Sequence, residues 1–103
     1  MRSVNRFTIL GNVGKVHTFD RVTKVSIATN RVWTDDSGQR NERTDWVQLT
    51  ILDEGQAQWV AENVQSGDAV FAEGRISQNS YGSGEDRKFS TDLIVQVFNL
   101  LNS

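Results

Sequence analysis

The chain has 103 residues, of which 37% are hydrophobic, and a formal net charge of −2. This length is enough for one domain but not for two, and it leaves a small hydrophobic core, so self-association is a common source of extra stability. The chain has no cysteine, which excludes disulfides and thiolate metal sites. It has no apolar run of about 18 residues and no secretion signal at its start, so a soluble intracellular protein without a membrane span is expected.

The acidic residues are concentrated in the middle of the chain. The segment from Thr44 to Gly74 has six acidic residues and no Lys or Arg. The rest of the chain therefore holds all 11 basic residues and the other seven acidic ones, a balance of +4. This distribution is compatible with a basic groove on one side of the domain, although chance clustering is an alternative.

The N-terminal half of the sequence predicts three strands. Residues 4–10 are rich in β-forming residues and are followed by glycines that indicate a break. Residues 22–33 predict a second, longer strand, and residues 44–52 predict a third. Between them, residues 34–43 form a polar segment of turn-forming residues, which predicts a long loop.

One helix is predicted between Gly55 and Gly67. An acidic residue at position 53 or 54 favours its start, and Gly67 is expected to end it. Its apolar residues follow the i, i+3, i+4, i+7 spacing of a narrow helical face: Ala57, Val60, Ala61 and Val64.

After the helix the sequence predicts two more strands. Residues 68–77 and 88–101 have strand character, and residues 78–87 form a second long polar loop. The resulting order, three strands, a helix and two strands, is that of an OB-fold, an all-β, five-stranded Greek-key barrel. Two packed sheets or an α+β sandwich would accept the same elements. With any of these three folds, residues 1–103 are expected to form a single domain.

The third predicted strand has two different faces. Its alternate positions divide into an aliphatic row and a row that combines Trp with polar residues: Val47, Leu49 and Ile51 against Trp46, Gln48 and Thr50. We expect the aliphatic row in the core and Trp46 on the outside. An exposed indole offers a large π surface on which a nucleic-acid base can stack. The alternative is that Trp46 packs under a loop or against another subunit.

Two more aromatic residues lie near the polar loops. Trp33 ends the second strand, at the lip of the sheet face that carries Trp46, and Tyr81 lies inside the second loop. Basic residues interleave with these aromatics, as expected where rings take bases and cations neutralise the phosphates of a single strand. The predicted phosphate contacts are Arg6, Lys15, Arg31, Arg40, Arg43, Arg75, Arg87 and Lys88.

The other aromatic residues and the single histidine have simpler interpretations. Trp59 lies beside the apolar stripe of the helix and is expected to be structural. The five phenylalanines fall in strand patterns and are expected in the core or in an interface: Phe7, Phe19, Phe71, Phe89 and Phe98. His17 has neither a cysteine nor a second histidine as a partner, so no metal site and no cofactor are expected.

Three stretches in order resemble one family. SVNRFTILGNVG (residues 3–14), SIATNRVWTDDSGQRNERTDWVQLTIL (residues 26–52) and AENVQSGDAVFAEGRI (residues 61–76) are similar to the bacterial and mitochondrial single-stranded DNA-binding proteins. The resemblance covers nearly the whole chain and implies an OB-fold that binds and protects single-stranded DNA in replication, recombination and repair. It also implies a homotetramer, located in the cytoplasm with the nucleoid or in the mitochondrial matrix.

The resemblance also implies roles for particular residues. Trp33 and Trp46 match the two family Trp residues that stack on bases, and Tyr81 falls where the family often has another stacking Trp. Leu52 falls where many members place a stacking Phe, so this platform is weakened here. Gln48 takes a position that is often basic, and Val47 one that is often His.

The sequence departs from the family pattern in two places. The segment between Gly14 and Val22 is shorter than usual, so the first hairpin is expected to be trimmed. The sequence ends at Ser103, without the Gly/Gln-rich tail and acidic tip through which bacterial members recruit repair enzymes. Replication or repair proteins remain candidate partners, although the usual acidic docking tail is absent from this sequence.

Three rival functions remain open from the sequence. An OB-fold accessory module of a primosome would mainly bridge partners and bind single strands more weakly, and an RNA-binding barrel could use the same stacking chemistry. An enzyme is disfavoured. In GNVGKV (residues 11–16) the glycine spacing of a phosphate loop is absent and Val follows the Lys. The adjacent acidic pairs lie in loops or at a helix start, where acids are ordinary, so no catalytic residue is predicted.

Overall fold

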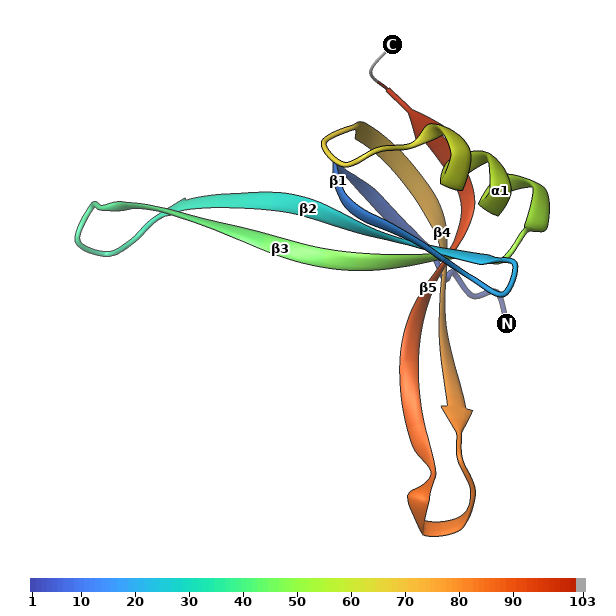
Figure 1. The fold of residues 1–103 in the computed structure, drawn as a ribbon. Helices are drawn as coiled ribbons and strands as arrows, with labels where there is room; N and C mark the ends of the chain where they lie inside the picture. The colour runs from blue at the N-terminus through green and yellow to red at the C-terminus, as the bar shows by residue number, and fades with distance from the viewer. Residues whose placement is uncertain (102–103) are drawn as a thin grey trace.

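The computed structural model describes residues 1–101, and the last two residues of the predicted domain, 102 and 103, lie outside this part. The elements are β1 (Phe7–Phe19), β2 (Val22–Thr34), β3 (Arg40–Ile51), α1 (Glu54–Asn63), β4 (Ala69–Tyr81), a 3₁₀ turn η1 (Gly84–Asp86) and β5 (Lys88–Leu100). The strands close into a barrel in the order β1-β2-β3-β5-β4, and β1 also pairs with β4. The predicted OB-fold with its helix between the third and fourth strands is confirmed (Figure 1).

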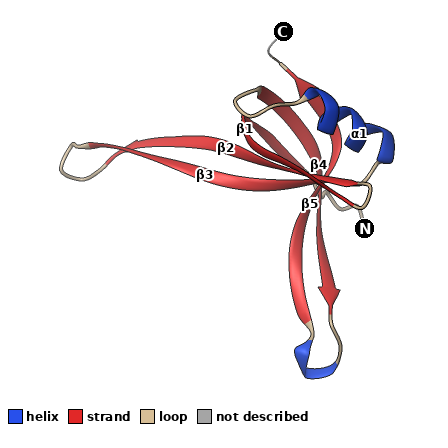
Figure 2. Ribbon diagram, in the orientation of Figure 1, coloured by secondary structure: helices blue, strands red, loops and turns tan. Residues whose placement is uncertain are grey.

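Two long hairpins leave the barrel in different directions, as Figure 1 shows for β2–β3 and β4–β5. The β2–β3 ladder is continuous from Thr23 opposite Ile51 to Thr34 opposite Arg40. The β4–β5 ladder likewise continues to the end of β4. About half of each loop predicted from polar composition is therefore strand, and turns over residues 35–39 and 82–87 remain at the tips (Figure 2). Beyond the barrel both hairpin faces meet solvent, so no apolar alternation marks these strand residues in the sequence.

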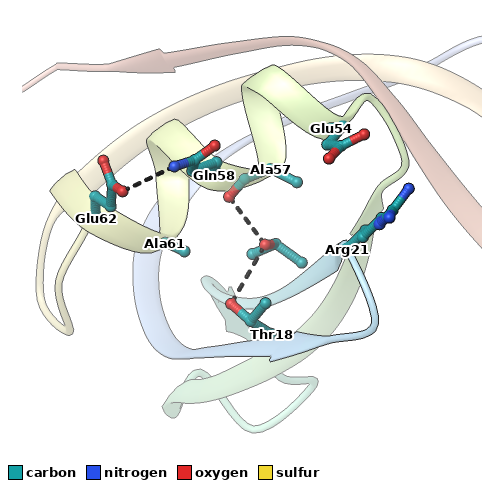
Figure 3. Close-up of a pocket in the computed structure, with 8 residues that line it drawn as sticks. Thr18, Arg21, Glu54, Ala57, Gln58, Ala61 and Glu62 are labelled. Atoms are coloured by element: carbon teal, nitrogen blue, oxygen red, sulfur yellow. Dashed lines mark hydrogen bonds between the residues drawn. The ribbon is translucent and has the colours of Figure 1, made fainter.

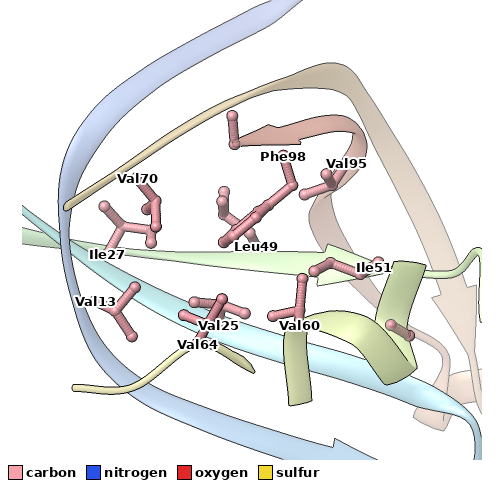
Figure 4. Close-up of a cluster of buried hydrophobic side chains, with 12 residues drawn as sticks. Val13, Val25, Ile27, Leu49, Ile51, Val60, Val64, Val70, Val95 and Phe98 are labelled. Carbon is pink, nitrogen blue, oxygen red and sulfur yellow. The ribbon is translucent and has the colours of Figure 1, made fainter. Parts of the chain in front are cut away.

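The core fills the interior of the barrel, and α1 packs against it, as Figure 4 shows. The predicted aliphatic row of β3 contributes Leu49 and Ile51, both fully buried, and Val47 packs against them partly buried. Opposite them, β2 supplies fully buried aliphatic residues, and α1 adds Val60. Thr50 belongs to the row predicted to be exposed, but it is only 7% exposed. It lies in register with Ile94 of β5, and the closing strand covers it.

The helix begins where the sequence predicts and ends earlier. The side chain of Asp53 accepts a hydrogen bond from the backbone N–H of Gln56 (2.9 Å), which caps the N-terminus of α1. The helix stops at Asn63, so the prediction that Gly67 ends it is wrong. Gly67, at φ +96°, instead forms a turn whose N–H donates to the carbonyl of Val13 in β1. Of the predicted apolar face, three residues are buried, and Ala61 is exposed at its edge.

The first strand differs most from the prediction. It does not end at residue 10 but runs through both glycines to Phe19. These glycines allow close approach within the sheet: a Cβ at Gly11 would overlap the carbonyl oxygen of Ala28. The register between β1 and β2 shifts between Val13 and Val16, which marks an irregularity beside Gly14.

Several large aromatic side chains lie outside the core. Phe98 is buried as expected, and Phe7 and Phe71 are half-buried. Phe19 and Phe89 are largely exposed, which contradicts a core position for either one. Trp59 is 46% exposed on α1, so it is not a core residue. Exposed rings of this size are candidates for contacts with a ligand or a second subunit.

Candidate nucleic-acid interface

Trp46 lies on the outside of β3 and is 63% exposed, as the sequence predicts. Its six-membered ring occupies the space beside Gly14, where an added Cβ would overlap the ring. The indole thus rests across the β1–β2 surface instead of projecting freely. An open hollow of about 430 Å³ adjoins it, lined by Gly14, Lys15, Ser26, Trp46 and Ser66. This hollow combines an aromatic surface, two hydroxyls and a cation.

A second hollow of about 260 Å³ continues the first along the outside of the barrel. The two share Lys15 and Ser26, and the second is also lined by His17, Lys24 and Gln48. Lys24 is a basic residue that the sequence analysis missed. The signal was present, because Lys24 alternates with buried residues of β2 and so belongs to its outer row.

Trp33 does not lie on the same face as Trp46, which corrects the expectation from sequence. The β2–β3 register has no shift between the two residues, and Trp46 stands opposite Ala28. Trp33 is five positions further along β2, an odd number, so its side chain points to the other face of the hairpin. Each hairpin has two faces. We call the face whose residues are in phase with the core-facing residues of the barrel the inner face, and the opposite one the outer face. Trp33 is on the inner face and Trp46 on the outer face.

Arg31 is fixed beside Trp33 on the inner face. Its guanidinium carbon lies 5.2 Å from the centroid of the Trp33 ring, and its Nε lies 2.7 Å from Oδ2 of Asp45. Arg31 also stands directly opposite Arg43 in the ladder. Like charges at such positions destabilise a sheet, and one carboxylate offsets them only in part. The inner face therefore presents an aromatic ring, 43% exposed, beside an excess of positive charge.

The outer face of the β4–β5 hairpin brings together three of the predicted residues. Tyr81 is the last residue of β4, not part of a loop, and it stands opposite Lys88. Arg75 lies six positions earlier on β4 and so shares this face. Tyr81 is 57% exposed. One side of the hairpin thus carries an exposed phenol ring with one cation directly across the ladder and a second cation further along the strand.

Arg87 lies on the inner face of the same hairpin with Phe89. The guanidinium carbon is 5.6 Å from the centroid of the Phe89 ring, and Nη2 donates a hydrogen bond to Oγ of Ser80 (3.1 Å). Ser80 stands opposite Phe89 in the ladder. The sequence predicts both Arg87 and Lys88 as phosphate contacts, and the structure separates them onto two faces of the hairpin.

Three other predicted residues are less closely associated with these surfaces. Arg6 lies at the far end of β1 from Lys15, and it pairs with Glu73 at 2.6 Å. Arg40 begins β3 at the tip of the β2–β3 hairpin, on the outer face. Leu52 directly follows β3 and is half exposed, continuing the outward row beyond the buried Thr50.

The tip of the β2–β3 hairpin is organised by one carboxylate. Asp35 accepts hydrogen bonds from the backbone N–H groups of Ser37 and Gln39, from the Ser37 hydroxyl and from the Asn41 amide. These bonds lower the pKa of Asp35 to about 2, and the bond from the Ser37 side chain has the largest effect. The Asp35 carboxylate thus stabilises the turn between β2 and β3.

The helix side of the barrel has a different character. A hollow of about 270 Å³ lies between α1 and the β1–β2 turn, where Figure 3 shows Glu54, Glu62 and Arg21 around Ala57 and Ala61. Acidic residues outnumber the single cation there, which agrees with the acidic middle segment of the sequence. This hollow has no aromatic ring and little attraction for phosphate, in contrast to the hairpin faces.

In residues 1–101, no three His, Asp or Glu side chains gather as a metal site would require. Over the same residues, the helices are too short or too polar to traverse a bilayer.

Comparison with known proteins identifies sequence relatives. The model of the single-strand binding protein family matches residues 4–101. A single-stranded DNA-binding protein from Rhizobium meliloti is 32% identical over 94% of this chain, and one from Rickettsia felis is 30% identical over 94%. This chain spans 60% of the Rhizobium meliloti protein and 69% of the Rickettsia felis protein.

Solved structures share the same fold. A Plasmodium falciparum SSB in complex with ssDNA superposes with a TM-score of 0.79 at 20% identity, covering 99% of this chain and 98% of that one. A mitochondrial single-stranded DNA-binding protein from S. cerevisiae, Rim1, has a TM-score of 0.67 at 24% identity, covering 96% of both chains.

Proposed function

The chain belongs to the single-strand binding protein family, and from this premise we propose that it binds single-stranded DNA without sequence preference and protects it during replication, recombination and repair. The observation that carries the proposal is the exposed Trp46 ring, held beside Gly14 next to a hollow that contains Lys15. An aromatic platform with a neighbouring cation can hold any base and its phosphate.

The proposed contacts divide into stacking and phosphate neutralisation. Trp46 and Trp33 are the main platforms, Tyr81 is a secondary one, and Leu52 is a weak apolar contact. The basic residues that support the phosphates lie on the same hairpins or in the outer hollows: Lys15, Lys24, Arg31, Arg40, Arg43, Arg75, Arg87 and Lys88. Arg6 contributes least, because its charge is already satisfied by Glu73.

This function needs no chemical step. Stacking and ion pairing hold the strand reversibly, so the protein acts as a binding module and not as an enzyme. It works wherever single-stranded DNA is exposed, in a bacterial nucleoid or a mitochondrial matrix.

A homo-oligomer, most simply a tetramer, is part of the proposal. Leu10 and Val97 are exposed apolar residues on the outside of β1 and β5, and the half-buried Phe71 of β4 lies beside Leu10 in the ladder. A barrel this small gains stability when a second copy covers such a surface.

A second function, a partner-docking accessory module with weaker single-strand binding, makes a different prediction. Such a module would not need exposed rings on both hairpins. A titration with oligo-dT, a matched RNA strand and a duplex of equal length separates these functions. The proposal expects strong quenching of Trp fluorescence by oligo-dT and much weaker binding of the duplex. Equal affinity for duplex and single strand, or no quenching, would contradict it.

A further inference from the structure

We propose that the Arg87–Phe89 pair, on the inner face of the β4–β5 hairpin, is an additional nucleotide-binding site of this protein. One base stacks on Phe89, and the adjacent phosphate contacts Arg87. This inference rests on the proposed function. It adds Phe89 to the stacking residues and gives the β4–β5 hairpin a second binding face, opposite the one that carries Tyr81.

The exposure and support of Phe89 carry the first step. The ring is 61% exposed although it is purely hydrophobic, so it is available to a ligand or to a second subunit. It is also held in place: Arg87 lies against it, and Arg87 in turn donates to Ser80, directly across the ladder. A ring already ordered by its neighbours loses little entropy when a base stacks on it.

The second step is a comparison with the other hairpin. Arg31 and Trp33 of β2 are also two residues apart, and they also form a cation–π pair on the inner face. Each hairpin thus carries a largely exposed aromatic on its outer face, Trp46 or Tyr81, and one Arg–aromatic pair on its inner face. A single strand that contacts the inner face of β2–β3 can find the same chemistry on β4–β5.

The charge of Arg87 carries the third step. Arg31 has a carboxylate partner, Asp45, at 2.7 Å. In residues 1–101 Arg87 makes no ion pair, and the hydroxyl of Ser80 does not neutralise it. Its full charge therefore remains available to a phosphate. An unpaired cation beside the ring makes this pair better suited to binding a nucleotide than to forming an apolar contact between subunits.

The experiment measures oligo-dT affinity at one salt concentration for Phe89→Leu, Phe89→Tyr and Phe19→Leu. Phe19 is the matched control, because it is a similarly exposed Phe near the tip of a different hairpin and has no Arg over its ring within the described residues. We expect Phe89→Leu to weaken binding roughly fivefold or more, the lower end of the cost of losing one stacked base. Phe89→Tyr keeps an aromatic ring and should bind as tightly as the parent, and so should Phe19→Leu. Thermal unfolding of each variant checks that the fold is intact.

The salt dependence tests the role of the cation. Arg87→Gln should reduce the log–log salt slope by about 0.7, the value for one phosphate of a single strand, whereas Arg21→Gln beside α1 should leave it unchanged. Phe89→Leu with parent affinity, or with a lower solution mass as its only defect, would overturn the inference while leaving the proposed function intact. If the parent protein itself does not bind oligo-dT, the proposed function fails instead.

Discussion

Trp33 and Trp46 lie on opposite faces of the β2–β3 hairpin, with Trp46 outside and Trp33 in phase with the core-facing residues of the barrel. They are five strand positions apart, about 17 Å along the hairpin at the usual rise per residue. A strand of DNA that stacks on both rings therefore has to contact both faces of the hairpin.

The separation of the two rings predicts additive losses. Trp33→Ala and Trp46→Ala should each cost about 1–3 kcal/mol of binding free energy, and the double variant should lose the sum to within about 0.5 kcal/mol, since the rings share no partner. A double-mutant cycle with oligo-dT measures this. A coupling energy well above that margin would mean that both rings act on the same base.

Gly14 should be intolerant of even a methyl group. In Gly14→Ala the new Cβ overlaps the ring of Trp46, so the indole must move from its place on the β1–β2 surface. We expect reduced affinity for oligo-dT and a shifted Trp emission. Gly55→Ala is the control, because its Cβ would meet only Asp53 at 3.7 Å within helix α1. That variant should bind as the parent does, and equal losses in both would argue against the Gly14 contact.

Asp45 should restrain binding although it lies among the proposed contacts. Asp45→Asn releases Arg31 from its ion pair, so we predict tighter binding at low salt and a steeper salt slope. Glu42→Gln removes the same charge from the same strand, but Glu42 lies on the outer face. The emission of Trp33 in the free protein should change only in Asp45→Asn. An unchanged emission in both would show that Asp45 does not position Arg31 against the ring.

The tip of the β2–β3 hairpin should resist acid. Because hydrogen bonds to the carboxylate lower the pKa of Asp35 to about 2 from 3.8, its stabilising effect is fully present above pH 4 and is lost as the pH falls through about 2. Amide exchange at Ser37 and Gln39, followed by NMR, reports this. Protection lost already near pH 4 would be inconsistent with these bonds, and Asp35→Ala should remove the protection at neutral pH.

Self-association should depend on the outside of β1. Leu10→Glu places a charge in the exposed apolar row without disturbing the core, since Leu10 is exposed. We expect the solution mass to fall from about four times the chain mass of 11.6 kDa toward that of the dimer or the single chain. A parent protein that sediments as a single chain would contradict the tetramer.

The sequence predicts most of the fold because core positions alternate or recur regularly. Leu49 and Ile51 mark the inner row of β3, and Val60 marks the buried stripe of α1. The hairpin ends escape prediction because both of their faces meet solvent, so Tyr81 looks like a loop residue. The sequence also does not predict how the binding residues divide between the two hairpin faces. The face on which Trp33 lies is known only once the strand register is known to be unbroken from Trp33 to Trp46. Phe89 is misassigned because exposure cannot be read from residue type.

The most direct test of the account is a fluorescence titration of oligo-dT against the parent, Trp46→Ala and Trp59→Phe at one salt concentration. Trp46 borders the hollow that contains Lys15, whereas Trp59 is on α1, on the acidic side of the barrel. The account predicts strong quenching in the parent, a loss of about 1–3 kcal/mol per site in Trp46→Ala, and parent-like affinity in Trp59→Phe. Parent-like binding by Trp46→Ala together with weakened binding by Trp59→Phe would contradict it and assign the DNA to the helix side of the barrel.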